Sequence, residues 1–167
     1  MTERSWTEIQ SLAVRAATGA QVPPAQALAF GAMLARHLAD GGSEDPLSAA
    51  LQAPDGVVTL AHKVETMIEQ ASLSPRIVTV CEADAGRRAL LISWLASLPC
   101  QVEITASADK VRARLCLSEP SARARPTRVS IGSALSQQLQ DLAARTYVPD
   151  SAASRRGGAG AGLMELD

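Results

Sequence analysis

The stretch Ile77-Val78-Thr79-Val80-Cys81 decides the fold class, because a helical pattern gives way there to a strand-like one. Its β-branched residues are typical of a buried strand, and the run is too short for a helix. The residues before it read as helices, and those after it alternate between strands and helices. The sequence therefore predicts a mixed α/β (α+β) fold with about four strands and about five to six helices, in which a helical N-terminal half packs on a small sheet layer.

Four helices are expected upstream of this stretch. Ser5 and Glu8 have the spacing of a capping box, which starts the first helix. Pro24 opens the second, since the N–H that proline lacks is unpaired at a helix start anyway. A short third helix is expected over residues 45–52, and residues 54–56 read as a turn before the fourth. The predicted buried positions are Ile9, Leu12, Ala13 and Ala16 in the first helix, Leu28, Gly31, Leu34, Ala35 and Leu38 in the second, and Leu60, Val64, Met67, Ile68 and Ala71 in the fourth.

Downstream, the pattern predicts a helix, a hairpin, a further strand and a last helix. Asp84 is placed to cap the helix that follows the first strand. Residues 102–106 and 111–117 read as the two strands of the hairpin. A further strand is expected over residues 127–131, and Ser133 is expected to cap the last helix.

A change in composition near residue 149 divides the chain into two parts. Residues 1–148 read as one globular domain, mainly helical over 1–74 and mixed over 75–148. Residues 149–167 read as a Gly-rich C-terminal arm, in which residues 157–162 are all glycine or alanine. Such a segment loses the most backbone entropy on ordering, so it is either loose or held in place for a reason.

Charge and composition exclude several classes of partner. The 167 residues carry 16 basic and 17 acidic side chains, so the net charge is −1. A chain that neutralises many phosphates carries a basic excess, and we therefore expect neither nucleic acid nor a membrane surface as a partner. Aromatic residues make up only 2% of the chain, which leaves few rings for stacking on a base or a flavin, and no cofactor is predicted.

The location of the protein is predicted from its start and its cysteines. Residues 1–6 lack the apolar segment of a secretory signal, and no apolar run reaches the ~18–20 residues that span a bilayer. Cys81, Cys100 and Cys116 cannot all pair with one another, and each lies among aliphatic residues. These features predict reduced thiols in a cytoplasmic protein.

Two stretches of the chain resemble a family of bacterial proteins of uncharacterised function. The first is Ser5-Trp-Thr-Glu-Ile-Gln-Ser-Leu-Ala-Val-Arg-Ala-Ala-Thr-Gly19, and the second is Leu142-Ala-Ala-Arg-Thr-Tyr-Val-Pro149, followed by Ser151, Ser154-Arg155 and Gly158-Ala-Gly-Ala-Gly162. The resemblance implies a relationship and no activity. Members carry a Trp-Gly pair and two acidic residues in the second helix and end in an Asp-rich tetrapeptide. At these two places this chain has Pro23-Pro-Ala-Gln-Ala-Leu-Ala29 and Met164-Glu-Leu-Asp167 instead. The resemblance therefore implies that this chain has lost part of any activity that needs the Trp-Gly pair and the acidic residues.

The Gly-rich arm is the strongest candidate for a binding site. Successive glycines can turn their amides toward one point and form a nest for an anion, and arginine suits bidentate recognition of phosphate or carboxylate. The candidate ligand-binding residues are Arg145, Tyr147, Ser154, Arg155, Arg156, Gly158, Gly160 and Gly162. The alternative is a flexible arm that holds no ligand.

Arginines form a second cluster, two of them in a surface loop expected over residues 118–126. The five are Arg112, Arg114, Arg123, Arg125 and Arg128. Pairing Ala106 with Val111 sets the register of the hairpin. Glu103 then lies opposite Arg114, which predicts a solvated face with a cross-strand ion pair worth a few tenths of a kcal/mol. The alternative is a functional patch that attracts anions.

Groups for catalysis or metal binding are sparse and scattered. Three cysteines and two histidines show no C-x-x-C or H-x-x-x-H spacing, so no metal site is predicted. Cys81 ends a predicted strand, where active groups gather in α/β folds, but no spacing links a histidine to it. Glu65 and Glu69 are one helical turn apart and read as a solvated stripe. Catalytic residues are therefore unknown.

The second predicted helix favours an oligomer. Only Gln26, Arg36 and Asp40 are clearly polar on it. A helix that is apolar nearly all round is buried, either inside its own domain or against another subunit. This pattern favours a homodimer.

Two functions from different classes fit the sequence, which by itself leaves the function unknown. The first is a non-enzymatic binding or accessory protein, oligomeric, whose C-terminal arm contacts a small anionic ligand or a partner. The second is a small enzyme with a site built from the arm, Tyr147 and strand-end polar residues such as Glu82 and Asp84.

Overall fold

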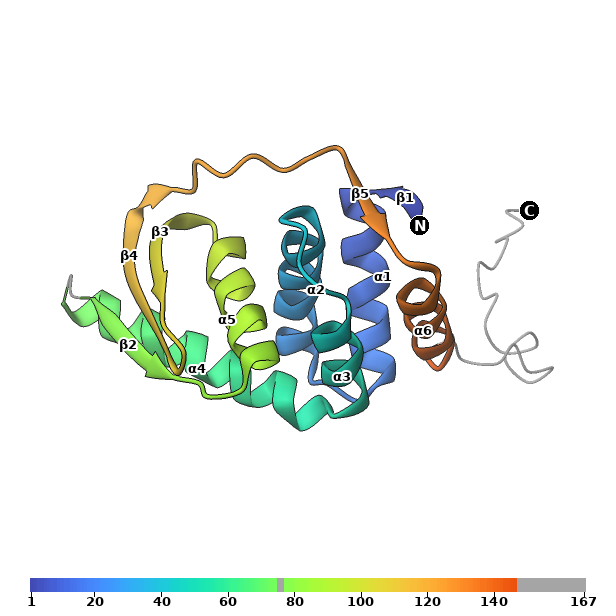
Figure 1. Cartoon of the computed structure of the whole chain (residues 1–167), viewed down its shortest axis with the longest axis horizontal. Coiled ribbons are helices and arrows are strands. Elements are labelled where there is room, and N and C mark those ends of the chain that lie inside the picture. Colours follow the sequence, from blue (N-terminus) through green and yellow to red (C-terminus); the bar gives the residue numbers. More distant parts are fainter. Residues whose placement is uncertain (75–76, 147–167) are drawn as a thin grey trace, which may run out of the picture.

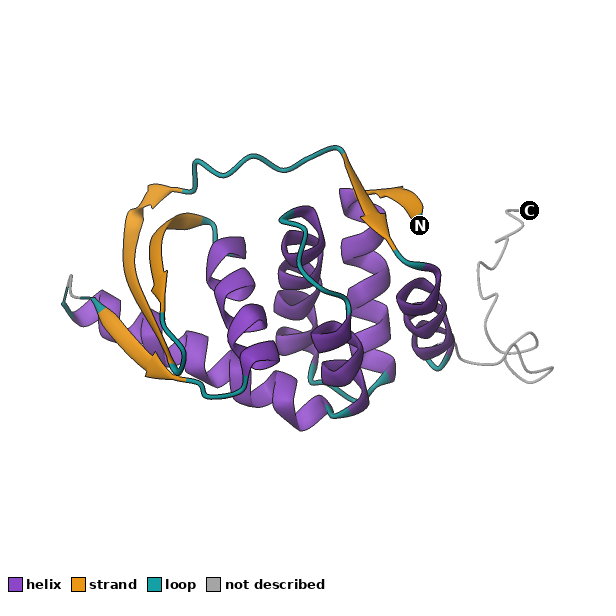
Figure 2. Cartoon of the chain, viewed as in Figure 1, coloured by secondary structure: helices purple, strands orange, loops and turns teal. Residues whose placement is uncertain are grey.

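The structure is a computed structural model that describes residues 1–74 and 77–146. Within those ranges it holds six helices and five strands, with a helical N-terminal half (Figures 1 and 2). The predicted mixed α+β class is therefore confirmed. In chain order the elements are β1 (Thr2–Ser5), α1 (Trp6–Gly19), α2 (Pro24–Ala39), α3 (Asp45–Gln52), α4 (Pro54–Leu73), β2 (Val78–Cys81), α5 (Ala85–Ser97), β3 (Cys100–Ala106), β4 (Lys110–Pro120), β5 (Arg128–Ile131) and α6 (Ser133–Ala144).

Helix α2 is the centre of the helical layer. It packs against both α1 and α5, and α1 also packs against α6 (Figure 1). The close approach of α1 and α2 depends on Gly31, where a Cβ atom would lie 2.5 Å from Cγ2 of Val14. Most of the apolar surface of α2 is buried inside the chain, so it is covered without a second subunit. The helix therefore no longer favours a homodimer, which stays a prediction.

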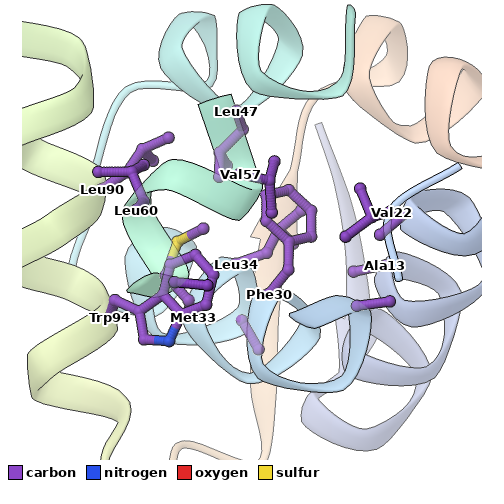
Figure 3. Close-up of a cluster of buried hydrophobic side chains, with 14 of the residues drawn as sticks. Ala13, Val22, Phe30, Met33, Leu34, Leu47, Val57, Leu60, Leu90 and Trp94 are labelled. Atoms are coloured by element: carbon purple, nitrogen blue, oxygen red, sulfur yellow. The ribbon is translucent and has the colours of Figure 1, made fainter. Parts of the chain in front are cut away.

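One hydrophobic core joins the helices to both sheets. Phe30 and Met33 of α2 lie in it with Leu60 of α4 and Trp94 of α5, all of them buried (Figure 3). Burial of each such side chain contributes about 1.5–3 kcal/mol. One predicted core position is wrong, because Leu28 is 62% exposed. It lies at the rim of a groove between α1 and α2.

The strands form two antiparallel sheets instead of the single layer expected. One has the order β2-β4-β3, and the other pairs β1 with β5. The hairpin register is as predicted: Ala106 pairs with Val111, and Glu103 lies opposite Arg114 with 3.9 Å between their charged atoms. The sequence predicts no strand over residues 2–5, because this segment is short and polar and shows no apolar alternation. Their pairing with β5 is what separates that strand from the other three.

Residues 121–127 connect the two sheets, and we call this segment the strap. Figure 1 shows it arching over one end of the row of helices α5, α2 and α1, from the end of β4 to the start of β5. The surface loop predicted over residues 118–126 is wrong at its start, because β4 continues to Pro120.

Two predicted helix starts are wrong. Residues 54–56 are the first turn of α4 and not a separate turn, since proline is well placed at the start of a helix. Ser133 lies inside α6, and the N-cap is Gly132. The backbone N–H of Gly132 donates to Oε1 of Glu44 at 2.5 Å. A carboxylate from the segment before α3 therefore satisfies the start of α6, which local sequence cannot show.

Candidate anion-binding site

The strap is fastened at three points along its length. The backbone N–H of Ser121 donates to the carbonyl of Pro99 at 2.8 Å, and the N–H of Trp6 donates to the carbonyl of Thr127 at 3.2 Å. Between these ends, Nη2 of Arg36 donates to the carbonyl of Ala124 at 2.8 Å. The middle of the strap is therefore held by a side chain from α2.

Arg36 is a buried cation, 6% exposed, in the last turn of the apolar helix α2. Its Nη1 lies 3.2 Å from Oδ1 of Asp40, one turn along α2, and its guanidinium carbon lies 5.0 Å from the centre of the Trp6 ring. Its Nε is also buried, and no described residue accepts a hydrogen bond from it. Buried polar groups are normally paired, so this N–H is an unused donor.

Trp6 is positioned by the start of α1. The predicted capping box of Ser5 and Glu8 is present, and it holds the first turn so that the indole faces α2. The ring N–H donates to Oε1 of Gln10 at 3.1 Å. A second guanidinium, that of Arg125 on the strap, lies 5.9 Å from the ring centre. One indole therefore contacts a buried cation and an exposed one, both attracted by its π electrons.

A pocket of about 300 Å³, which we call the strap pocket, lies between the strap and the helices. Apolar and small side chains form much of its wall, and three arginines supply its charge. Among the described residues it is lined by Trp6, Gln10, Ala32, Arg36, Ala96, Ser97, Leu98, Pro99, Pro120, Ser121, Arg123 and Arg125. This lining contains no carboxylate. The pocket therefore combines cationic donors with apolar walls, as small-molecule sites often do.

Two of the five arginines in the predicted cluster reach this pocket. Arg123 and Arg125 line it from the strap, and neither forms an ion pair with any residue that the structure describes. Arg114 instead pairs with Glu103 on the sheet, as predicted. Arg112 and Arg128 lie on strands and do not line the pocket. The predicted solvated face with its cross-strand ion pair therefore lies on the hairpin. The two arginines that could attract an anion lie on the strap.

The strand-end carboxylates of the enzyme hypothesis are held in local structure. Glu82 is buried and accepts hydrogen bonds from Lys63 at 2.5 Å and from Arg87 at 3.2 Å. Burial alone raises the pKa of Glu82, but the Lys63 hydrogen bond, the Asp84 amide and the two cations outweigh it, so the pKa lies below its ordinary value. Asp84 accepts from the N–H of Arg87 at 2.7 Å and caps α5 as predicted.

His37 and Ser93 form a buried pair away from the strap pocket. Nε2 of His37 lies 2.8 Å from the carbonyl of Ser43, which can only accept, so Nε2 carries a hydrogen. Nδ1 lies 2.8 Å from Oγ of Ser93. The imidazole packs so closely on the next turn that a Cβ atom at Gly42 would collide with it. These contacts fix the turn after α2 to α5.

The remaining predicted site residues lie elsewhere. Arg145 is exposed directly after α6 and lines a separate groove between α3 and α6. The other candidates in and before the C-terminal arm, namely Tyr147, Ser154, Arg155, Arg156, Gly158, Gly160 and Gly162, lie outside the described residues. Of the predicted ligand-binding residues the structure thus places only Arg145, which does not line the strap pocket.

The other chemical groups read as structural. Cys81 is exposed, and burial raises the pKa of the Cys100 thiol. Glu65 is exposed and bonds His62 at 3.0 Å. Over residues 1–74 and 77–146 no cluster of His, Cys, Asp and Glu has the geometry to hold a metal ion. No helix in the same ranges has both the length and the apolar character needed to cross a membrane.

Trp6 and Arg36 are the functional candidates that sequence reasoning missed. A signal was present for Arg36, since it is one of only three clearly polar residues on an apolar helix. A charged residue in such a position needs a buried partner. For Trp6, the only signal was its place directly after the capping residue of α1.

Comparison with protein-family models, with curated proteins and with solved structures finds no match for this chain.

Proposed function

We propose that this chain is a non-enzymatic binding or accessory protein for a small organic anion, and that the strap pocket holds the anion. The observation that carries the proposal is Arg36. Its guanidinium is buried in the pocket wall with Nε unpartnered among the described residues, and the lining contains no carboxylate.

The electrostatics of the pocket favour an anion. Burying a guanidinium costs free energy unless it is paired, and the only described ion-pair partner of Arg36 is Asp40, which is 42% exposed. An anion that reaches the Arg36 guanidinium from the pocket would add a hydrogen bond to a charged group, worth about 1.5–3 kcal/mol. Arg123 and Arg125 on the exposed strap would attract the anion before it enters.

The small-enzyme hypothesis has no observation in its favour among the described residues. A carboxyl that serves as a general acid at neutral pH needs a raised pKa, whereas the pKa of Glu82 is lowered. The C-terminal arm stays a predicted second contact for the ligand or for a partner. The homodimer and the cytoplasmic location also stay predictions.

The indole of Trp6 provides a direct test of binding. The chain has two tryptophans, and Trp94 is buried in the core. A Trp94→Phe variant therefore leaves Trp6 as the only indole. Acetate, succinate and inorganic phosphate are titrated separately at low ionic strength, where screening is weak. We expect a saturable change in Trp6 fluorescence with at least one of these probes, weakening as sodium chloride is added.

Variants on the strap locate the site. Replacing Arg123 and Arg125 together by Gln is expected to weaken binding at least tenfold, since both side chains are exposed and their removal leaves the core intact. Arg112→Gln is the matched control, because Arg112 is exposed on β4 and does not line the pocket. Unchanged affinity in the double variant would reject the proposal, and so would the absence of a saturable signal with every probe.

A further inference from the structure

We infer that the ligand of the strap pocket is a short aliphatic dicarboxylate. This inference rests on the proposed function and names the class of anion that the pocket takes. It comes from the charge balance of the pocket, the chemistry of its wall and the spacing of its arginines.

The charge balance of the pocket favours an anion with two negative charges. Three guanidiniums line the pocket, from Arg36, Arg123 and Arg125. Asp40 is ion-paired with the first, and no described carboxylate pairs with the other two. Three positive charges and one negative charge leave two positive charges uncompensated. A monoanion would neutralise half of this charge, and a dianion would neutralise all of it.

The buried arginine and the two strap arginines lie at different depths in the pocket. Arg36 is buried and lines the pocket wall, whereas Arg123 and Arg125 belong to the exposed strap. A single compact oxyanion against Arg36 would leave the strap arginines in water. A molecule with one acidic group at each end can meet the buried and the exposed cations together, each with a planar fork that matches a carboxylate.

Part of the pocket wall is apolar. Ala32, Ala96, Leu98, Pro99 and Pro120 all line the pocket, beside the polar Gln10, Ser97 and Ser121. Oxygens of phosphate or sulfate that lie against the apolar groups would find no donor side chain there, and a buried oxygen without a donor costs free energy. Methylene groups would instead bury apolar surface there at about 25 cal/mol per Å². The wall therefore favours an aliphatic linker over an inorganic anion.

The spacing of the arginines favours a short linker. The guanidinium carbons of Arg36 and Arg125 lie 5.0 and 5.9 Å from the centre of one indole ring. Both are thus within reach of a molecule of a few carbon atoms. The pocket volume of about 300 Å³ is at the lower limit of about 300–1,000 Å³ for ligand sites. Succinate and glutarate fit within this volume and carry a carboxylate at each end of a short linker.

A series of matched acids tests the inference in the Trp94→Phe chain. Succinate is compared with butyrate, which has the same carbon chain and one carboxylate, and then with glutarate, adipate, pimelate and inorganic phosphate. We expect succinate or glutarate to bind at least tenfold more tightly than butyrate, and affinity to fall from adipate to pimelate. Replacing Arg123 and Arg125 by Gln should reduce succinate to the affinity of butyrate, while Arg112→Gln leaves the preference intact.

Any other outcome would reject either the dicarboxylate inference or the proposed function. Equal affinity for butyrate and succinate would overturn the dicarboxylate inference and leave anion binding in place. Tightest binding of inorganic phosphate would likewise overturn it. Binding of no acid and no phosphate would reject the proposed function itself. The strap arginines are exposed, but Trp94 lies in the core. Calorimetric titration of the wild-type chain with succinate and butyrate therefore repeats the comparison without the Trp94→Phe change.

Discussion

The guanidinium carbon of Arg36 lies 5.0 Å from the ring centre of Trp6, and this contact joins the last turn of α2 to the first turn of α1. The same guanidinium holds the carbonyl of Ala124 on the strap. One side chain thus connects two helices and the segment that links the two sheets (Figure 1). The candidate site and the placement of the strap depend on the same residue.

Arg36→Lys is expected to loosen the strap. Lysine keeps the charge but lacks the planar fork that reaches Asp40 and Ala124 together. The loss of one hydrogen bond and part of a cation–π contact should lower the free energy of unfolding by about 1–3 kcal/mol. Limited trypsin digestion followed by mass spectrometry measures the strap directly, at the bond between Arg123 and Ala124. Cleavage there should be faster in the variant than in the wild-type chain.

An exposed arginine on the sheet provides the control for the strap experiment. Arg112→Lys should change neither the free energy of unfolding nor the rate of cleavage after Arg123. If Arg36→Lys cleaves at the wild-type rate, the Arg36–Ala124 hydrogen bond does not hold the strap. Succinate should slow cleavage in the wild-type chain if it fills the pocket beneath.

Glu82 is expected to make stability depend on pH. Its pKa is lowered in the folded chain, so the stability it contributes is present in full above its unfolded-state pKa of about 4.3 and is lost as pH falls through the lower folded-state value. Glu82→Gln should therefore cost about 1–3 kcal/mol at neutral pH, since it leaves Lys63 and Arg87 without their carboxylate. The cost should shrink in acid. Urea unfolding at pH 7 and below pH 4 measures both values.

Glu65→Gln is the matched control for Glu82. Glu65 lies on α4, as Lys63 does, is exposed, and forms an ion pair with the exposed His62. Its replacement should change stability by less than about 0.5 kcal/mol at neutral pH. A pH-independent cost of Glu82→Gln would contradict the assignment of Glu82 as an ionised, ion-paired group.

Two glycines are expected to respond in opposite directions to alanine. A Cβ atom at Gly19, the last residue of α1, would collide with the backbone carbonyl of Leu142 in α6. Gly19→Ala should therefore destabilise the fold by about 1–3 kcal/mol or more through overpacking. At Gly56, in the first turn of α4, no atom lies within 4 Å of the added carbon. Gly56→Ala should stabilise by about 0.5–1 kcal/mol, and calorimetric unfolding compares the two.

Removal of residues 150–167 tests the prediction that the C-terminal arm contacts the ligand. If glycine amides together with Arg155 and Arg156 add donors to the anion, the truncated chain should bind succinate more weakly than the full chain in calorimetric titration. Unfolding of the truncated chain should be unchanged, which is the control for folding. Equal affinity would confine the site to the strap pocket and remove the predicted role of the arm.

Local patterns in the sequence were sufficient for most of the helices and for the hairpin. The capping box of Ser5 and Glu8, the cap at Asp84 and the cross-strand pair of Glu103 and Arg114 all follow from spacing along one segment. Such features are local because the groups that satisfy one another lie within a few residues or directly across a turn. Errors arose where a distant segment intervenes, as when Glu44 caps α6.

The sequence by itself determined which segments become helices and strands, because backbone hydrogen bonding and apolar periodicity act within each segment. Only the tertiary structure decided that Trp6, Arg36 and Arg125 meet at one pocket. These residues come from two helices and a connection between sheets, and no spacing along the chain encodes their proximity. Whether a charge on an apolar helix becomes a site depends on what the fold packs over it.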